Sequence, residues 1–354
     1  MIDLQAILSK AIDRQGSDIY ILPGSPVLVK VSGKMEPLTE ERVLPVDSEY
    51  LLKEAYTMAL DRSMDRLIET GDDDFSFSLQ RMGRFRCNAY RQRGTLASVL
   101  RSVPFGLPDP EKLGIPKAVM DLAFTRRGMI LVTGPAGSGK STTLACMIDK
   151  INKANYDHII TIEDPIEYLH PHKTSIVSQR EIMHDTENYA HALRAALRQA
   201  PDVILLGEMR DFETIQTALT AAETGHLLLS TLHTVGAAKT IDRVIDVFPA
   251  NQQQQVRIQL SMVLQAVVSQ QLIPSISGSG MEAAFEIMIV NSAIQNMIRE
   301  GKVHQMDNVI YAGAAQGMIT MDADLQRLYM QKKISKENAL LYAVNPDILA
   351  KKLI

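Results

Sequence analysis

Residues 128–143 read GMILVTGPAGSGKSTT, and the rest of the chain can be placed around them. The pattern of a phosphate-binding loop is Gly, four free positions, Gly, Lys and then Ser or Thr. Those positions are filled by Gly134, Gly139, Lys140 and Ser141. The apolar run at 129–132 predicts a buried strand before the loop, and the apolar spacing over 141–151 predicts a helix after it. This order of strand, loop and helix favours a true phosphate site over an accidental glycine-rich turn.

Each residue type in this loop has a physical task. Glycines let the backbone curl so that its N–H groups can surround an anion at the positive end of the following helix. Lys140 is expected to reach the β- and γ-phosphates, and the Ser141 hydroxyl to ligate Mg²⁺. The predicted nucleotide-binding residues are Gly134, Pro135, Ala136, Gly137, Ser138, Gly139, Lys140, Ser141 and Thr142.

The composition is that of an ordinary globular protein with more than one domain. The 354 residues are 46% apolar and 22% charged, with a formal net charge of -4, which does not favour a nucleic-acid partner. Cys87 and Cys146 suggest neither a disulfide framework nor a zinc site, and a reducing cytosol fits them. The sequence shows no export leader and no apolar run near the roughly 18 residues of a membrane-spanning helix. Membrane association is therefore expected only through a partner or a surface patch.

Periodicity divides the chain into four parts. Residues 1–103 predict a small α+β domain, with helices over 1–16 and 48–69, and residues 104–116 contain four prolines and predict a linker. Residues 117–275 alternate strands and helices, which predicts a parallel sheet with helices on both faces. Residues 252–270 are expected to be one helix, and residues 281–354 a small helical region.

The first part contains two charged stretches. Asp72, Asp73 and Asp74 are expected to form a solvated turn and are given no chemistry. Six arginines crowd into about twenty residues, so that an anion-binding role and a solvated strand face are equally favoured. They are Arg81, Arg84, Arg86, Arg91, Arg93 and Arg101.

Acids and a histidine follow the apolar strands of the sheet. Glu163 comes after the strand that ends at Ile162, Glu208 follows the strand that ends at Leu206, and His233 follows the next one. Parallel sheets bind ligands at the carboxyl ends of their strands, so these side chains are expected to converge beside the phosphate loop. For His226 and His233 we expect a contact with the nucleotide or with the neighbouring carboxylate, since no partner stands at metal-ligand spacing.

Over nearly its full length the sequence resembles the type IV pilus retraction ATPases, the PilT family of the secretion ATPase superfamily. The resemblance is carried by the phosphate loop and by TIEDPIE at 161–167, GEMRD at 207–211, AAETGH at 221–226 and TLHT at 231–234. It implies a homohexameric ring that hydrolyses ATP with Mg²⁺. Each subunit would combine a PAS-like N-terminal domain, a RecA-like P-loop ATPase core and a C-terminal helical region, in the α/β class.

The resemblance also implies roles for single residues. Glu163 looks like the group that polarises the attacking water, and Glu208 looks like the Walker B acid that holds magnesium together with Ser141. His226 and His233 occupy the histidine box. Arg86 and Arg101 stand at the positions of arginine fingers. The resemblance therefore favours the anion-binding role of the arginine cluster over a solvated strand face.

The implied partner is an inner-membrane pilus platform protein, at the cytoplasmic face of that membrane, with no nucleic acid. A motif similar to the family's AIRNLIRE begins at Ala293, and Gln295 replaces an arginine there, which bears on coupling to retraction and not on hydrolysis. Two alternatives stay open at this point. One is a pilus assembly or type II secretion ATPase of the same superfamily, and the other is a RecA-like nucleic-acid motor, which would need a basic, aromatic channel.

Overall fold

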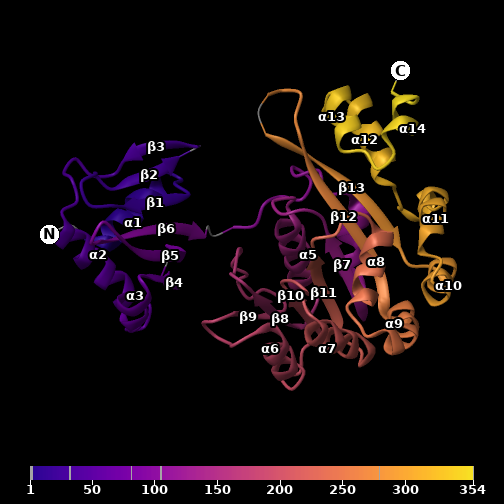
Figure 1. The fold of residues 1–354 in the computed structure, drawn as a ribbon, viewed down its shortest axis with the longest axis horizontal. Helices are drawn as coiled ribbons and strands as arrows, with labels where there is room; N and C mark the ends of the chain where they lie inside the picture. Colours follow the sequence, from indigo (N-terminus) through magenta and orange to yellow (C-terminus); the bar gives the residue numbers. More distant parts are fainter. Residues whose placement is uncertain (1–2, 32, 81, 104–105, 279, 354) are drawn as a thin grey trace. The chain divides into compact units, whose positions relative to one another are not determined.

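The computed structural model describes residues 3–31, 33–80, 82–103, 106–278 and 280–353, and Figure 1 shows the order of the elements. The chain forms two compact units, the first from residues 1–106 and 167–169, the second from 107–166 and 170–354. Arg81 of the arginine cluster and residues 104–105 of the expected linker lie outside the described residues. Residues 106–116 contain neither helix nor strand.

The first unit is a six-stranded antiparallel sheet with three helices. The strand order is β3-β2-β1-β6-β5-β4. The strands are β1 (Asp18–Ile21), β2 (Leu28–Val31), β3 (Lys34–Pro37), β4 (Asp72–Leu79), β5 (Gly83–Gln92) and β6 (Thr95–Val103). The helices are α1 (Leu4–Asp13), α2 (Pro45–Met58) and α3 (Asp65–Thr70). Their apolar faces share one core that includes Leu8, Leu52 and Phe85.

Two expectations for this unit are wrong. The single helix over 48–69 is divided into α2 and α3, because Leu60 and Asp61 adopt positive φ angles of 59° and 53° that an α-helix does not allow. The acidic stretch at 72–74 is not a solvated turn, since it begins β4. Asp73 is buried, and it accepts hydrogen bonds from Arg62 Nη2 at 3.0 Å and from the Tyr56 hydroxyl at 3.0 Å.

The second unit is built on a seven-stranded sheet of order β13-β12-β7-β11-β10-β8-β9. All neighbours from β12 to β9 are parallel, and β13 is antiparallel to β12. The strands are β7 (Gly128–Thr133), β8 (His158–Glu163), β9 (Ile176–Glu181), β10 (Val203–Leu206), β11 (Leu227–Leu232), β12 (Leu264–Pro274) and β13 (Met281–Ile289). This confirms the buried parallel sheet, although β9 was not expected.

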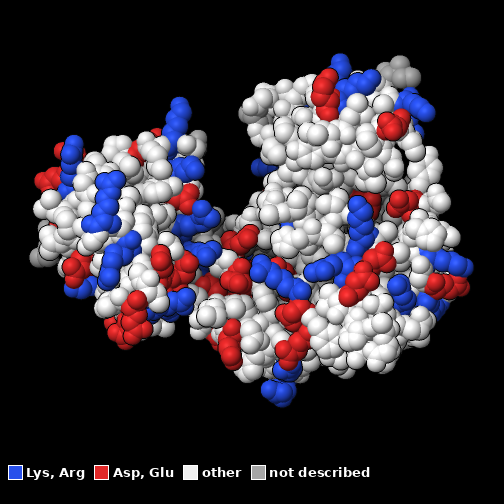
Figure 2. All heavy atoms as spheres, viewed as in Figure 1, with Lys and Arg blue, Asp and Glu red and all other residues white. Residues whose placement is uncertain are grey.

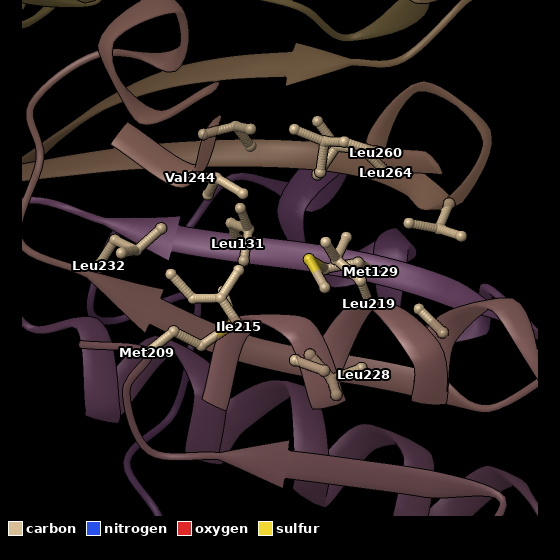
Figure 3. Close-up of a cluster of buried hydrophobic side chains, with 14 of the residues drawn as sticks. Met129, Leu131, Met209, Ile215, Leu219, Leu228, Leu232, Val244, Leu260 and Leu264 are labelled. Carbon is tan, nitrogen blue, oxygen red and sulfur yellow. The ribbon is translucent and has the colours of Figure 1, made fainter. Parts of the chain in front are cut away.

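Helices cover both faces of this sheet. They are α4 (Lys117–Asp121), α5 (Lys140–Ala154), α6 (Tyr189–Ala196), α7 (Phe212–Glu223), α8 (Ala237–Asp246), α9 (Ala250–Val263), α10 (Ser292–Glu300), α11 (Met306–Ala312), α12 (Met321–Met330), α13 (Lys336–Leu341) and α14 (Pro346–Ala350). Successive residues of β7 alternate between two cores. Met129 and Leu131 pack against α7, α8 and α9 (Figure 3), whereas Ile130 and Val132 belong to the core of α5.

The expected helix over 252–270 is correct only to Val263. From Leu264 the chain is strand β12, paired with β7, because a short, mainly apolar run fits a buried strand as well as a helix and the β-branched Val267 and Val268 favour the strand. The region after residue 281 begins with strand β13 before its helices start, so it is not helical throughout. Helices α12 to α14 pack on the end of the β12–β13 pair through Ile273 and Ala284.

The surface charge and the apolar character of the helices concern two expected partners, nucleic acid and membrane. On the face of the second unit shown in Figure 2, basic and acidic side chains are interspersed. Across the described ranges, no helix combines the length and the apolar character that a membrane crossing requires.

Candidate functional site

The phosphate loop joins the end of β7 to the start of α5. Gly139 is the N-cap of this 15-residue helix, with φ 86°, so the backbone N–H groups of the first turn face the loop. Lys140 is only 8% exposed, and its Nζ donates to the carbonyl oxygens of Gly134 and Pro135, each at 2.9 Å. The loop therefore combines a helix N-terminus with a nearly buried cation, the combination that holds phosphate.

Gln270 of β12 supports this loop, a role that no pattern in the sequence predicts. Its side-chain Oε1 accepts a hydrogen bond from the Thr143 hydroxyl at 2.7 Å. A Cβ atom at Gly134 would lie 2.1 Å from the Gln270 carbonyl oxygen, and one at Gly139 would lie 2.8 Å from Gln270 Nε2. Gly134 is therefore required by the close approach of the β12 backbone, and both glycines are favoured by their positive φ angles.

The expected convergence of strand ends is present in the sheet. Strands β7, β11, β10 and β8 are consecutive and parallel, so the phosphate loop, His233, Glu208 and Glu163 lie along one edge. Glu208 accepts hydrogen bonds at Oε2 from Arg210 Nε at 2.6 Å and from His233 Nε2 at 3.3 Å. The hydrogen bond to Glu208 raises the pKa of the Arg210 guanidinium.

Glu163 is the last residue of β8, whereas the sequence predicted that it follows the strand. Its Oε1 accepts hydrogen bonds from the Thr161 hydroxyl at 2.6 Å and from Gln179 Nε2 at 3.2 Å. Three strand spacings separate β8 from β7, or about 14 Å along the edge of the sheet. Phosphates held by the loop must therefore extend past the ends of β11 and β10 to approach this carboxylate.

His226 is not brought to this edge. It precedes β11, whereas His233 follows it, and a six-residue strand places them about 20 Å apart. His226 Nδ1 lies 2.9 Å from the carbonyl oxygen of Ala221 at the end of α7. Within a single chain the two histidines therefore lie at opposite edges of the sheet, because β11 runs between them, and the contact of His226 with a nucleotide or a carboxylate stays a prediction.

Arg86 and Arg101 belong to the first unit. They are directly opposite each other on β5 and β6, so their side chains share one face of that sheet. Arg101 Nε contacts Asp18 Oδ1 at 2.8 Å, and Arg86 Nε lies 3.9 Å from Asp74 Oδ1. Both side chains remain substantially exposed, and each has an acidic neighbour.

Several features fit a nucleotide with its phosphates at the loop. The hydroxyl oxygen of Ser138 is buried and has no hydrogen-bond partner among the residues that the structure describes. A cavity of about 380 Å³ adjoins the loop. Its lining includes Leu113, Ile115, Gly139, Thr142, Leu272 and Met281.

Within the described part of the chain there is no cluster of three or more His, Cys, Asp or Glu suited to a metal ion.

Comparison with known proteins gives a consistent result. Residues 1–347 match the model of a family described as "Type II/IV secretion system protein". The chain is 45% identical to the type IV pilus retractation ATPase PilT of Pseudomonas aeruginosa, over 98% of this chain and 99% of that protein. It is 51% identical to a twitching motility protein of Neisseria gonorrhoeae, over 78% and 74% of the two chains. A crystal structure of the pilus retraction motor PilT with bound ADP matches with a TM-score of 0.90 and 47% identity, over 99% and 100% of the chains.

Proposed function

The chain belongs to the type II/IV secretion system protein family, among the pilus retraction ATPases, and on this premise we propose that it hydrolyses ATP to drive retraction of type IV pili. The observation that carries the proposal is the alignment of the phosphate loop, Glu208 and Glu163 along one edge of the parallel sheet. A phosphate site with two acidic side chains beside it provides what phosphoryl transfer to water requires: charge neutralisation and a group that orients the water.

The loop would hold the phosphates. Backbone N–H groups at the start of α5 and the Lys140 ammonium would bind the β- and γ-phosphates, and the adjoining cavity, which is lined by both apolar and charged side chains, would take the nucleoside. Ser141 and Glu208 would hold Mg²⁺, which in such sites shares its ligands between one or two protein oxygens and the phosphates. The bound ion would supply charge neutralisation on the phosphate oxygens.

Glu163 would act on the attacking water. Its carboxylate lies three strands from the loop, so the terminal phosphate would have to extend past the ends of β11 and β10 toward it. Its role is to orient the water and accept its proton. His233 would assist by its contact with Glu208.

The active form would be a homohexameric ring, as the family resemblance implies. Arg86 and Arg101 of the first unit would stabilise the charge on the transferred phosphoryl group, which arginine fingers do in other nucleotide hydrolases. His226, on the opposite edge of the sheet, keeps a catalytic role only as a prediction for the assembled ring. The ring would act in the cytoplasm, at the inner membrane, where it contacts a platform protein.

Glu163→Gln tests the assignment. The amide cannot accept the proton from water, so we expect turnover to fall about 10²- to 10⁴-fold while ATP affinity stays near the wild-type value. Phosphate release and nucleotide affinity are measured on assembled rings, and Glu167→Gln, an exposed acid of the same motif, is the matched control. Wild-type turnover by Glu163→Gln would falsify the assignment.

The direction of motion requires a cellular test. Deletion of the gene in its host should leave cells with excess pili and no twitching, whereas loss of an assembly ATPase would leave cells without pili. Phosphate release measured with and without single-stranded DNA separates both from a nucleic-acid motor, which DNA would stimulate.

A further inference from the structure

Glu163 is held by side chains from two neighbouring strands. Thr161 of β8 and Gln179 of β9 are direct register partners, and Glu163 lies two residues beyond Thr161, so all three side chains project from the same face of the sheet. We infer that Thr161 and Gln179 are positioning residues that set the orientation of the Glu163 carboxylate for hydrolysis. The inference rests on the proposed role of Glu163.

Both residues donate to the same oxygen. The Thr161 hydroxyl lies 2.6 Å and Gln179 Nε2 lies 3.2 Å from Glu163 Oε1. The terminal torsion of a glutamate is broad and has no strongly preferred value, so hydrogen bonds to its oxygens decide how the carboxylate is turned. Two donors at one oxygen fix that torsion, and they thereby fix the direction in which the second oxygen points. Thr161 is fully buried, which makes its hydroxyl a rigid donor.

The orientation of the Gln179 amide is itself determined. Its Oε1 accepts a hydrogen bond at 2.8 Å from the backbone N–H of His170, which is buried. A backbone N–H can only donate, so the amide oxygen must face His170 and the NH₂ group must face Glu163. Gln179 is therefore held at its oxygen and presents a donor to the carboxylate, an arrangement that neither Glu nor an apolar residue can reproduce.

A purely structural role predicts different behaviour. If Gln179 only anchored the loop that leads to His170, an acceptor at this position would be enough. Gln179→Glu keeps an acceptor for the His170 N–H but replaces the NH₂ donor with a carboxylate that faces Glu163. Thr161→Val removes the hydroxyl at nearly constant volume, and Thr161→Ser keeps it. These substitutions separate the donor function from packing and from loop anchoring.

The experiment measures kcat for ATP hydrolysis and ADP affinity on assembled rings. We expect Thr161→Val and Gln179→Glu each to lower kcat about 10- to 100-fold, as small misplacement of a reacting group does, and to leave the ADP dissociation constant within about twofold. Thr161→Ser should restore most of the activity. The matched control is Thr214→Val, which removes another buried hydroxyl that donates to a carboxylate, that of Asp211 at 3.0 Å, and should retain wild-type kcat.

Two results would overturn the inference. One is wild-type kcat in Gln179→Glu together with wild-type kcat in Thr161→Val, and the other is a Thr161→Ser variant as slow as Thr161→Val. If Thr161→Val does not assemble, Gln179→Glu on the partly exposed edge strand decides alone. Glu163→Gln is measured beside them: if it is inactive while the positioning variants are active, only this inference fails, and if it is active, the proposed function itself fails.

Discussion

The two edges of the parallel sheet in the second unit are built from the same strands, and both carry charged and histidine side chains. At the carboxyl edge a helix begins: α5 follows β7 and presents N–H groups to the phosphate loop. At the amino edge a helix ends, and His226 Nδ1 lies against a carbonyl of the last turns of α7. A cavity of about 240 Å³ lies at this amino edge. Its polar lining includes Arg126, Asn155, Asp157, Asp202, Thr224 and His226.

The difference between the edges is the sign of the helix ends and not the presence of polar residues. A helix N-terminus carries about half a positive charge and a C-terminus about half a negative one. Phosphate is therefore favoured at the carboxyl edge, whereas the amino edge suits a hydrogen-bond donor such as a histidine. Four tests can break or sharpen this contrast.

The largest expected effect comes from the first unit. If phosphate is bound at the carboxyl edge, a positive charge brought to it in the ring should stabilise the transition state. Arg86→Ala and Arg101→Ala should then lower turnover by as much as the 10³ to 10⁵ typical of arginine fingers. Arg91→Ala, at an exposed arginine of the same strand, is the control. Undiminished turnover of Arg86→Ala in verified hexamers would mean that Arg86 is not part of the catalytic site.

Lys140→Ala should weaken binding as well as turnover. If the carboxyl edge binds phosphate, the ammonium would make charge-assisted contacts with the phosphates of both ATP and ADP, and loss of such a contact costs about 2 to 3 kcal/mol, or roughly 100-fold in affinity. Calorimetric titration with ADP measures it. Lys150→Ala on the same helix, where the ammonium contacts Asp121 at 3.1 Å, should bind normally. Equal affinity in the two variants would mean that the carboxyl edge is not the phosphate site.

The two histidines test the contrast on one strand. His233→Ala removes the group that contacts Glu208, and we expect turnover to fall by about tenfold, as for loss of a hydrogen bond to a charged group. His226→Ala should leave the ADP dissociation constant within about twofold, because this residue lies about 20 Å from His233, across the sheet. A large loss of ADP affinity in His226→Ala, with the ring intact, would contradict the placement of nucleotide at the carboxyl edge.

The smallest effect on chemistry is expected at α10, which is part of neither edge. Ile294 and Ile298 are buried in the main core, while Asn296 and Arg299 are exposed and hydrogen bonded to each other. Asn296→Ala and Arg299→Ala should leave turnover within about twofold but abolish retraction in cells. The exposed Lys351 provides a control in Lys351→Ala. Parallel loss of hydrolysis and retraction would instead indicate that α10 only supports the fold.

Much of the site could be predicted because it is encoded locally. The loop pattern can be recognised within eight consecutive residues. Glu208 and His233 each follow an apolar strand, and in a parallel sheet such side chains lie at the same edge. Gln179 and Gln270 could not be found this way. Gln179 acts on a residue of the neighbouring strand, and Gln270 acts on the phosphate loop and the helix that follows it. Which elements are neighbours, and in which register, is set by tertiary pairing that a single sequence does not reveal.

The same limit explains the errors in the fold. Residues 264–268 are apolar except for Gln265, so the short run fits a helix as well as a buried strand, and only pairing with β7 decides between the two. Sequence separation is also a poor guide to the distance between His226 and His233. The two residues are only seven positions apart in the sequence, but an extended strand of this length spans the sheet from its amino edge to its carboxyl edge.

The contacts of Gln270 with the phosphate loop affect the rates of nucleotide exchange. A glycine-rich loop that had to fold around its ligand would lose conformational entropy at every binding event, at roughly 1 to 2 kcal/mol for each residue that becomes ordered. Here strand β12 crowds Gly134 and Gly139, and the Thr143 hydroxyl is tied to the same glutamine, so the loop is shaped during folding. A motor that must release ADP and take up ATP in every cycle can then do so without remaking its binding site.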